Sequence, residues 1–267
     1  MARYAPPDPL HPHAPWAWGW AGLACGTVLA LVLFAPARWL AWAIASASGG
    51  HVTLEDARGT VWTGSAQWVL RGGHGSRDAV ALPSRLAWQL RPGLRGLHMA
   101  LSAPCCMPQP VVIRLQPRWQ GYWLAVADVA GSHWPAALLT GLGTPWNTLQ
   151  LDGQLLLSTR GLHVGWASQR LQVQGQIELR ALDMASRLTT LRPMGSYRLT
   201  LTGGTTPVLH LSTLAGDLQL SGNGQWEGSH LHFTGEARTT PEREAVLANL
   251  LNLLGRREGA RSIITLG

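Results

Sequence analysis

The run Leu171-Gln-Val-Gln-Gly-Gln-Ile-Glu-Leu-Arg180 decides the fold class of this chain. Apolar and polar side chains alternate along it, so an extended strand would carry the apolar ones on one face and the polar ones on the other. Strict alternation is typical of strands with one buried and one solvated face, which pair antiparallel rather than in a covered parallel sheet. The run therefore predicts an antiparallel sheet with one apolar face.

The same period of two recurs on both sides of this run. Its apolar positions are Leu149, Leu151, Leu155 and Leu157, then Tyr197, Leu199 and Leu201, Leu209 and Leu211, Leu218 and Leu220, and Leu231 and Phe233. Glycine interrupts several of these strands, at Gly153, Gly175, Gly222, Gly224 and Gly235. Glycine inside a strand commonly marks a bulge or a bend. We therefore expect a mainly β domain, in which a curved, largely antiparallel sheet lines its concave side with Leu, Val and Trp.

Two helices are expected beside the strands. The longer covers residues 240–254, where Thr240 can cap the first turn and Pro241 suits it. Its apolar side chains form one stripe: Leu247, Leu250, Leu251 and Leu254. Gly255 would end this C-terminal amphipathic helix, whose stripe would close one end of the apolar face. A shorter helix is expected from Pro135 to about residue 143.

A charge-free run, WAWGWAGLACGTVLALVLFA, occupies residues 16–35. About twenty apolar residues suffice for a helix to cross a bilayer, and Trp residues at both ends suit the headgroup layers. We expect a single N-terminal transmembrane helix over residues 16–36, a short tail over 1–15 and a β-rich domain over 50–267. A cleaved signal peptide is the alternative, although this run exceeds the usual 7–15-residue signal core. Counting basic residues leaves the orientation open, since Arg3 and Arg38 balance each other.

The positive charge of the chain comes entirely from arginine. The formal net charge is +7, with 21 basic residues and no lysine, which indicates a codon bias rather than a nucleic-acid surface. No nucleic-acid partner is expected. An acid-free stretch between Asp78 and Asp128 carries five arginines, namely Arg85, Arg91, Arg95, Arg114 and Arg118. It could face lipid phosphates or an acidic partner, but a solvated surface is the favoured interpretation.

Adjacent cysteines are the most distinctive chemical feature, at Cys105 and Cys106. In order of preference they predict a vicinal disulfide in a tight turn, an intermolecular disulfide, or metal ligands that lack a second pair. No nucleophile elbow, phosphate loop or zinc-protease motif is present in the sequence. His230 and His232 would share a strand face, but two ligands are too few for zinc. No enzymatic activity, cofactor or metal is expected.

Three stretches carry a resemblance to a known family. They are Gly59-Thr-Val-Trp-Thr-Gly64 with the alternating Ala66, Trp68 and Leu70, then Pro193–Gly203, and then Leu250–Arg257 with Ser262-Ile-Ile264. Together they resemble protein N of the type II secretion (general secretion) pathway over essentially the whole chain. The candidate structural or interaction residues are Gly59, Trp62, Gly64, Trp68, Tyr197, Leu250 and Leu254. Arg192-Pro193-Met194 departs conservatively from the Leu-Pro-Leu pattern of the family.

The resemblance implies an accessory inner-membrane subunit with a cytoplasmic tail and a periplasmic C-terminal domain. Such a subunit would support export of folded proteins across the outer membrane. Its partners would be other inner-membrane or pseudopilin subunits of the secretion system, and the membrane itself. It implies no catalytic or cofactor-binding residue.

A more distant similarity to AsmA-like envelope proteins supplies the alternative function. The glycine-bearing strands and the leucine-rich helix are similar to those proteins, whose curved sheets form a lipid-lined trough. The domain would then be a periplasmic lipid-binding or lipid-transfer module with an apolar groove for phospholipid. A groove and a closed core leave nearly the same sequence pattern, so both hypotheses stay open at this point.

Overall fold

A computed structural model describes residues 16–73, 75–94, 96–119, 121–167, 170–227 and 230–267. The chain divides into two compact units, Met1–Ala35 and Pro36–Gly267. The predicted tail over residues 1–15 lies outside the described residues. Because helix α2 (Ala37–Ala47) belongs to the second unit, that unit begins before the domain expected at residues 50–267.

Helix α1 of the first unit spans Trp16–Leu33. It coincides with the charge-free run but is shorter than the helix predicted over residues 16–36. Backbone hydrogen bonding within α1 stops before Pro36, whose ring removes a donor and disfavours helix at the preceding residue. Among the described residues, no helix combines the length and the apolar character needed to cross a membrane, so the predicted transmembrane helix gains no support from the structure.

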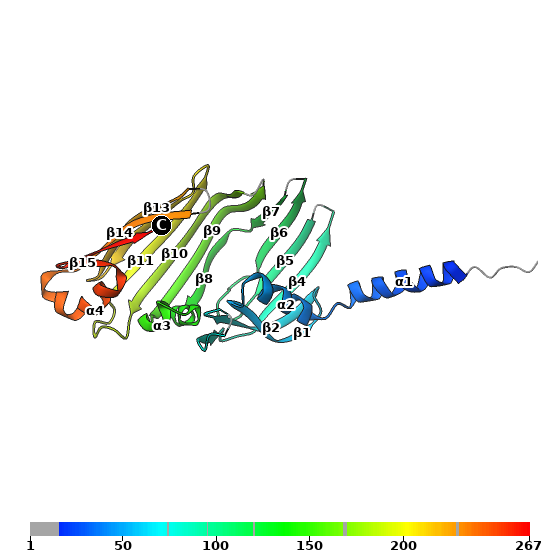
Figure 1. The fold of residues 1–267 in the computed structure, drawn as a ribbon, viewed down its shortest axis with the longest axis horizontal. Coiled ribbons are helices and arrows are strands. Elements are labelled where there is room, and N and C mark those ends of the chain that lie inside the picture. Colours follow the sequence, from blue (N-terminus) through cyan, green and yellow to red (C-terminus); the bar gives the residue numbers. More distant parts are fainter. Residues whose placement is uncertain (1–15, 74, 95, 120, 168–169, 228–229) are drawn as a thin grey trace, which may run out of the picture. The chain divides into compact units, whose positions relative to one another are not determined.

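One large antiparallel sheet forms most of the second unit (Figure 1). Its strands are β1 (Val52–Gly59), β2 (Thr63–Arg71), β3 (Ala79–Ala81), β4 (Leu86–Gly93), β5 (Gly96–Ser102), β6 (Val111–Arg118), β7 (Gly121–Val126), β8 (Val129–Pro135), β9 (Asp152–Ala167), β10 (Arg170–Ala185), β11 (Gly195–Gly204), β12 (Val208–Ala215), β13 (Gln219–Glu227), β14 (His230–Arg238), β15 (Arg256–Glu258) and β16 (Arg261–Leu266). The order is β1-β2-β4-β5-β6-β7-β9-β10-β11-β12-β13-β14-β16-β15, with β3 beside β2 and β8 beside β9. Among the described residues the two ends of this order are not joined, so the predicted mainly β, antiparallel class is confirmed as an open sheet.

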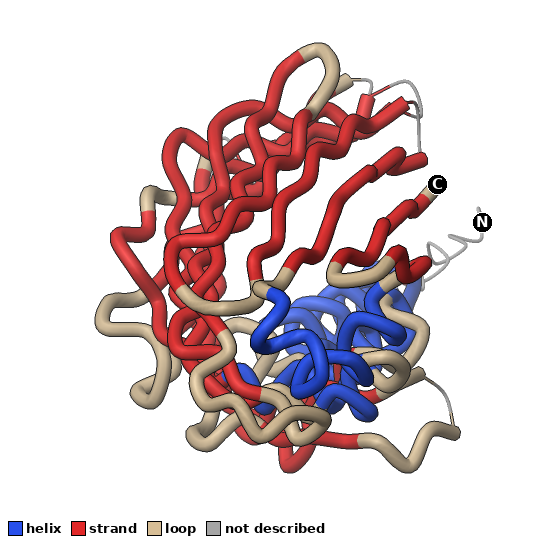
Figure 2. The backbone as a smooth tube through the Cα atoms, turned by 90° about the vertical axis from the view of Figure 1, so that its left-hand side faces the viewer, coloured by secondary structure: helices blue, strands red, loops and turns tan. Residues whose placement is uncertain are grey.

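The register confirms the apolar face that alternation predicted. Leu157, Leu179, Leu199 and Leu211 lie directly opposite one another on four consecutive strands. The ladder between β9 and β10 shifts register between Gln174 and Gln176. Gly175 sits at that bulge with φ +88°, a conformation that favours glycine. Bulges of this kind bend strands, and Figure 2 shows the strands as a curved layer. The side chain of Leu171 lies outside the described part of the chain.

Three of the strand glycines have a different role from the predicted bulges. A Cβ atom on Gly222, Gly224 or Gly235 would lie 2.4–3.0 Å from the ring of Phe233. The aromatic ring therefore rests on the bare backbone of β13 and β14, and its side chain is only 7% exposed. These glycines leave space for a ring rather than bend the strand, so the bulge interpretation was wrong for them.

Within the described part of the chain, five short helical segments accompany the sheet: α2 (Ala37–Ala47), η1 (Ala136–Leu142), α3 (Trp146–Leu149), η2 (Pro241–Arg243) and α4 (Glu244–Leu254). Helix α4 and the 3₁₀ turn η2 replace the single predicted helix over 240–254, and η1 is the shorter predicted one. Thr240 makes no side-chain capping bond. Gly255 is extended rather than left-handed, and a Cβ there would meet the carbonyl oxygen of Ile263 at 2.1 Å. Close strand approach therefore explains this glycine.

Candidate functional site

An apolar cavity of about 380 Å³ lies between the apolar face of the sheet and the helices α3 and α4. Its lining residues are leucine, isoleucine, alanine, methionine or aromatic, without exception. The floor includes Leu179, Leu199 and Leu211 from the row of opposed leucines. Half-enclosed apolar cavities of about 300–1,000 Å³ are the usual form of small-molecule sites. The cavity is therefore the main candidate binding site.

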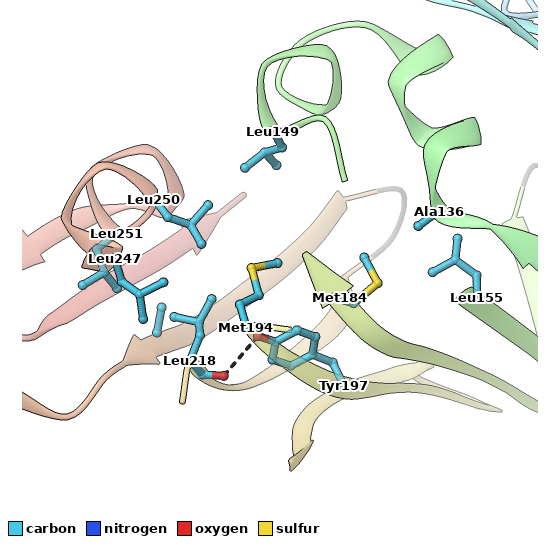
Figure 3. Close-up of a cluster of buried hydrophobic side chains, with 11 residues drawn as sticks. Ala136, Leu149, Leu155, Met184, Met194, Tyr197, Leu218, Leu247, Leu250 and Leu251 are labelled. Carbon is cyan, nitrogen blue, oxygen red and sulfur yellow. Dashed lines mark hydrogen bonds between the residues drawn. The ribbon is translucent and has the colours of Figure 1, made fainter. Parts of the chain in front are cut away.

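Three candidate residues from the sequence line this cavity: Tyr197, Leu250 and Leu254. Figure 3 shows Leu250 of α4 and Tyr197 of β11 within one cluster of buried hydrophobic side chains. Tyr197 is 6% exposed, and its hydroxyl donates a hydrogen bond to the carbonyl oxygen of Leu218 at 3.1 Å. Burial raises the pKa of this hydroxyl, so it stays a neutral donor. The leucine stripe of α4 thus closes the end of the apolar face as predicted.

The Gly59–Gly64 signature lies at the hairpin between β1 and β2. A Cβ on Gly64 would lie 2.5 Å from Cζ2 of Trp88 and 2.6 Å from the carbonyl oxygen of Arg58. Gly59 has φ +87°, and its Cβ would meet the carbonyl oxygen of Thr63 at 2.5 Å. Both glycines therefore allow a close turn beneath an indole ring.

Trp88 holds this hairpin, and the sequence reasoning missed it. It is 2% exposed, and its indole N–H donates to the carbonyl oxygens of Thr60 and Val61 at 3.3 and 3.1 Å. Trp62, one of the candidate structural or interaction residues from the sequence, is only partly buried. The alternation of Leu86, Trp88 and Leu90 along this stretch could have identified Trp88 as inward-facing.

Trp68 connects two clusters of buried side chains. It packs against the cluster of Ala66 and Trp88 and also against that of Leu82 and Leu138. Its ring meets Trp134 edge to face, with centroids 5.5 Å apart. Such aromatic pairs contribute packing, so the position of Trp68 is structural and lies away from the cavity.

Cys105 and Cys106 are joined by a disulfide in the structure. Cys105 is exposed, whereas Cys106 is 3% exposed within the cluster of Leu82 and Ala103. The backbone N–H of His133 donates to the carbonyl oxygen of Cys106 at 2.7 Å. The turn therefore lies against the end of β8, and Cys106 packs in the same cluster as Leu138 of η1. The role of these cysteines stays a prediction.

The arginine-rich stretch forms part of the polar face. Arg91, His98 and Arg114 lie opposite one another on β4, β5 and β6. The guanidinium carbon of Arg118 lies over the ring of Trp123, 6.0 Å from the ring centroid. Arg85 instead pairs with Asp56. Within the described residues, no group of three or more His, Cys, Asp or Glu side chains could hold a metal ion.

Comparison with known families identifies the chain. A family model described as type II secretion system (T2SS), protein N, matches residues 50–264. This chain belongs to the type II secretion system protein N family. Neither the curated proteins nor the solved structures contain a match. The matched range includes the Gly59–Gly64 hairpin, Trp88, the cavity and helix α4, so the resemblance inferred from the sequence is confirmed.

Membership of the protein N family indicates a role in type II secretion. The comparisons give no support to the lipid-binding alternative. That alternative therefore depends on the cavity alone.

The edges of the sheet are the second candidate site in this protein N chain. Strand β1 carries Glu55, Asp56 and Arg58 and shifts register between Glu55 and Arg58, and charges and bulges protect edges from pairing. Strand β15 pairs with residues 261–263 of β16. Residues Ile264–Leu266 of β16 pair with β14 on one side. On their other side, no strand of the described residues pairs with them. This short segment is the less protected edge.

A pH-dependent contribution to stability is predicted at the protected edge. Asp56 pairs with Arg58 and Arg85, both at 2.8 Å, and these partners lower its pKa, Arg58 most. Stability from this carboxylate is present above its ordinary pKa of 3.8 and is lost as the pH falls through the lowered folded-state value. We expect Asp56→Asn to lower the melting temperature slightly at pH 7, and less below pH 3.8.

Asparagine is the suitable replacement because Asp56 has φ +49°, which asparagine tolerates well. Thermal unfolding of both proteins at several pH values measures the effect. An equal difference at neutral and at acidic pH would contradict the assignment.

Proposed function

We propose that this chain is a non-catalytic accessory subunit of the type II secretion system at the inner membrane, where it supports export of folded proteins across the outer membrane. The family match over residues 50–264 carries this proposal. The partners would be inner-membrane or pseudopilin subunits of the same system.

The location in this proposal is a single-pass anchor with the C-terminal unit in the periplasm. The absence of charge over residues 16–37 favours an apolar environment for α1. Its large side chains are exposed all along it, for example Trp18 at 79% and Leu23 at 60%. An oxidising periplasm would also suit the disulfide between Cys105 and Cys106. Accessibility of the C-terminal unit to protease in spheroplasts tests the orientation.

The contact in this proposal is strand addition at Ile264–Leu266 of β16. An extended partner segment can pair with exposed backbone groups and place alternate side chains against the sheet. Leu266 is 59% exposed there and also lines the apolar cavity. A partner strand would therefore extend the sheet and cover an exposed apolar side chain at once.

Site-specific photocrosslinking in cells tests this contact. With a photoreactive amino acid at position 265, which is Thr265 in β16, we expect a crosslink to another secretion component. The matched control is Thr202, an exposed threonine of the central strand β11, which should give none. Deletion of the chain should reduce secretion of the exported proteins.

Two results would contradict the proposal. Full secretion after deletion would exclude the secretion role. Equal crosslinking from both positions would exclude the β16 edge while leaving that role intact.

A further inference from the structure

The apolar cavity adjoins a polar hollow of about 520 Å³. Two chain segments line both: residues 149–151 and residues 184–194. Leu151 belongs to both linings. A molecule that occupied both spaces would therefore be apolar at one end and polar at the other.

The loop between β10 and β11 is held firmly at this junction. Ser186 is 1% exposed, and its hydroxyl donates to the carbonyl oxygen of Leu149 at 2.6 Å. The backbone N–H of Leu188 donates to the same hydroxyl at 3.2 Å. The Ser186 hydroxyl thus fixes the backbone at this junction before any ligand binds, which lowers the ordering cost of binding.

The polar hollow carries excess positive charge. Arg187 and Arg192 line it, both exposed, and neither forms an ion pair or hydrogen bond with another described residue. Asp152 is the acidic group of the lining, and its carboxylate accepts the backbone N–H of Gly153 at 2.9 Å. The lining therefore carries two positive guanidinium groups and one negative carboxylate, and this net positive charge favours binding of an anion. A guanidinium group can donate two parallel hydrogen bonds to the oxygens of a phosphate.

We propose that this unit binds one anionic phospholipid, with an acyl chain in the apolar cavity and the phosphate at Arg187 and Arg192. An apolar cavity of about 150 Å³ accommodates benzene. In proportion, the 380 Å³ of this cavity would accommodate a chain of roughly 15 carbon atoms. The proposal goes beyond the secretion role and is independent of it.

Photoaffinity labelling of the full-length chain in detergent tests the acyl-chain site. The probe is phosphatidylglycerol with a diazirine near the end of one acyl chain. We expect labelled peptides from β10, β11 and β12. Ala181→Trp fills the cavity and should lower this labelling about tenfold or more. Arg180→Trp places the same side chain on the opposite face of β10 and should leave the labelling unchanged.

A second pair keeps the test decisive if Ala181→Trp fails to fold. Leu209→Trp adds less volume inside the cavity, whereas His210→Trp lies on the exposed, opposite face of β12. Circular dichroism verifies the fold of each variant. Labelling confined to α1, or undiminished when the cavity is filled, would overturn the proposal.

The headgroup preference is measured with phosphatidylcholine of the same acyl chains as competitor. The wild-type chain should prefer phosphatidylglycerol roughly tenfold, and Arg187→Gln with Arg192→Gln should abolish this preference. Equal competition by the two lipids in the wild-type chain would overturn the anionic part of the proposal. Deletion and crosslinking in cells report separately on the secretion role.

Discussion

Replacing Leu247 by alanine is expected to destabilise the β-rich unit by about 2–5 kcal/mol. Leu247 is fully buried, at 0% exposure, in the cluster that joins α4 to Leu218 and Ala237. Alanine removes apolar contacts and leaves space that the surrounding strands can fill only in part. The loss should therefore lie near the upper part of the usual range for single substitutions.

Thermal unfolding followed by tryptophan fluorescence measures this effect. For a unit of this size about 1 kcal/mol shifts the melting temperature by roughly 2–4 °C, so the decrease should be about 4–20 °C. Leu253→Ala is the matched control on the same helix, because Leu253 is 42% exposed, and it should change the melting temperature little. Similar decreases for both variants would show that α4 does not pack as described.

The second large effect is expected at Gly64, where valine should destabilise the β1–β2 hairpin by about 3 kcal/mol. Its Cβ would lie within 2.9 Å of Trp88 and of the carbonyl oxygens of Arg58 and Thr60. Two of these three atoms belong to the backbone, so a side-chain rotation cannot relieve the contact. The hairpin would have to open, and Trp88 would lose its bonds to Thr60 and Val61.

Gly204→Val is the control for this substitution. Gly204 also lies in a strand, but the nearest atom to a Cβ there is the carbonyl oxygen of Thr206 at 4.0 Å. Thermal unfolding should therefore separate the two variants by several degrees. Equal stability of both variants would contradict the close packing of Trp88 against Gly64.

The strand pattern of this sheet could be predicted from the sequence because its apolar face is continuous. Leu179 and Leu199 lie opposite each other on neighbouring strands. Each belongs to a run in which apolar residues occupy every second position, and this period of two in the sequence directly indicates one apolar face. Helix α4 was predictable for the same reason, since its stripe of leucines repeats with the helical period. Neither pattern depends on distant contacts.

Features that depend on distant contacts could not be predicted. Glycine beneath a ring and glycine at a bulge look alike in sequence, and only the position of Phe233 separates Gly222 from Gly175. Helix α2 is short and rich in alanine, and its packing of Leu40 and Ile44 beside Leu54 and Ala66 leaves little periodic signal. Likewise, the sequence pattern of an inward-facing leucine is the same whether its side chain packs against another side chain or lines a cavity.

The strand order has a consequence for how this sheet is made and altered. Strands that follow one another in sequence lie side by side, except where the order passes over β3, β8 and β15, so most ladders close over one hairpin. Contacts of low sequence separation cost little loop entropy and favour rapid folding. The sheet could therefore grow strand by strand as the chain is synthesised, with each new hairpin pairing against the one before it. Loss or gain of a hairpin would change the number of strands in the sheet without changing the connections between the remaining strands. Related chains can therefore differ in the width of the sheet by whole hairpins.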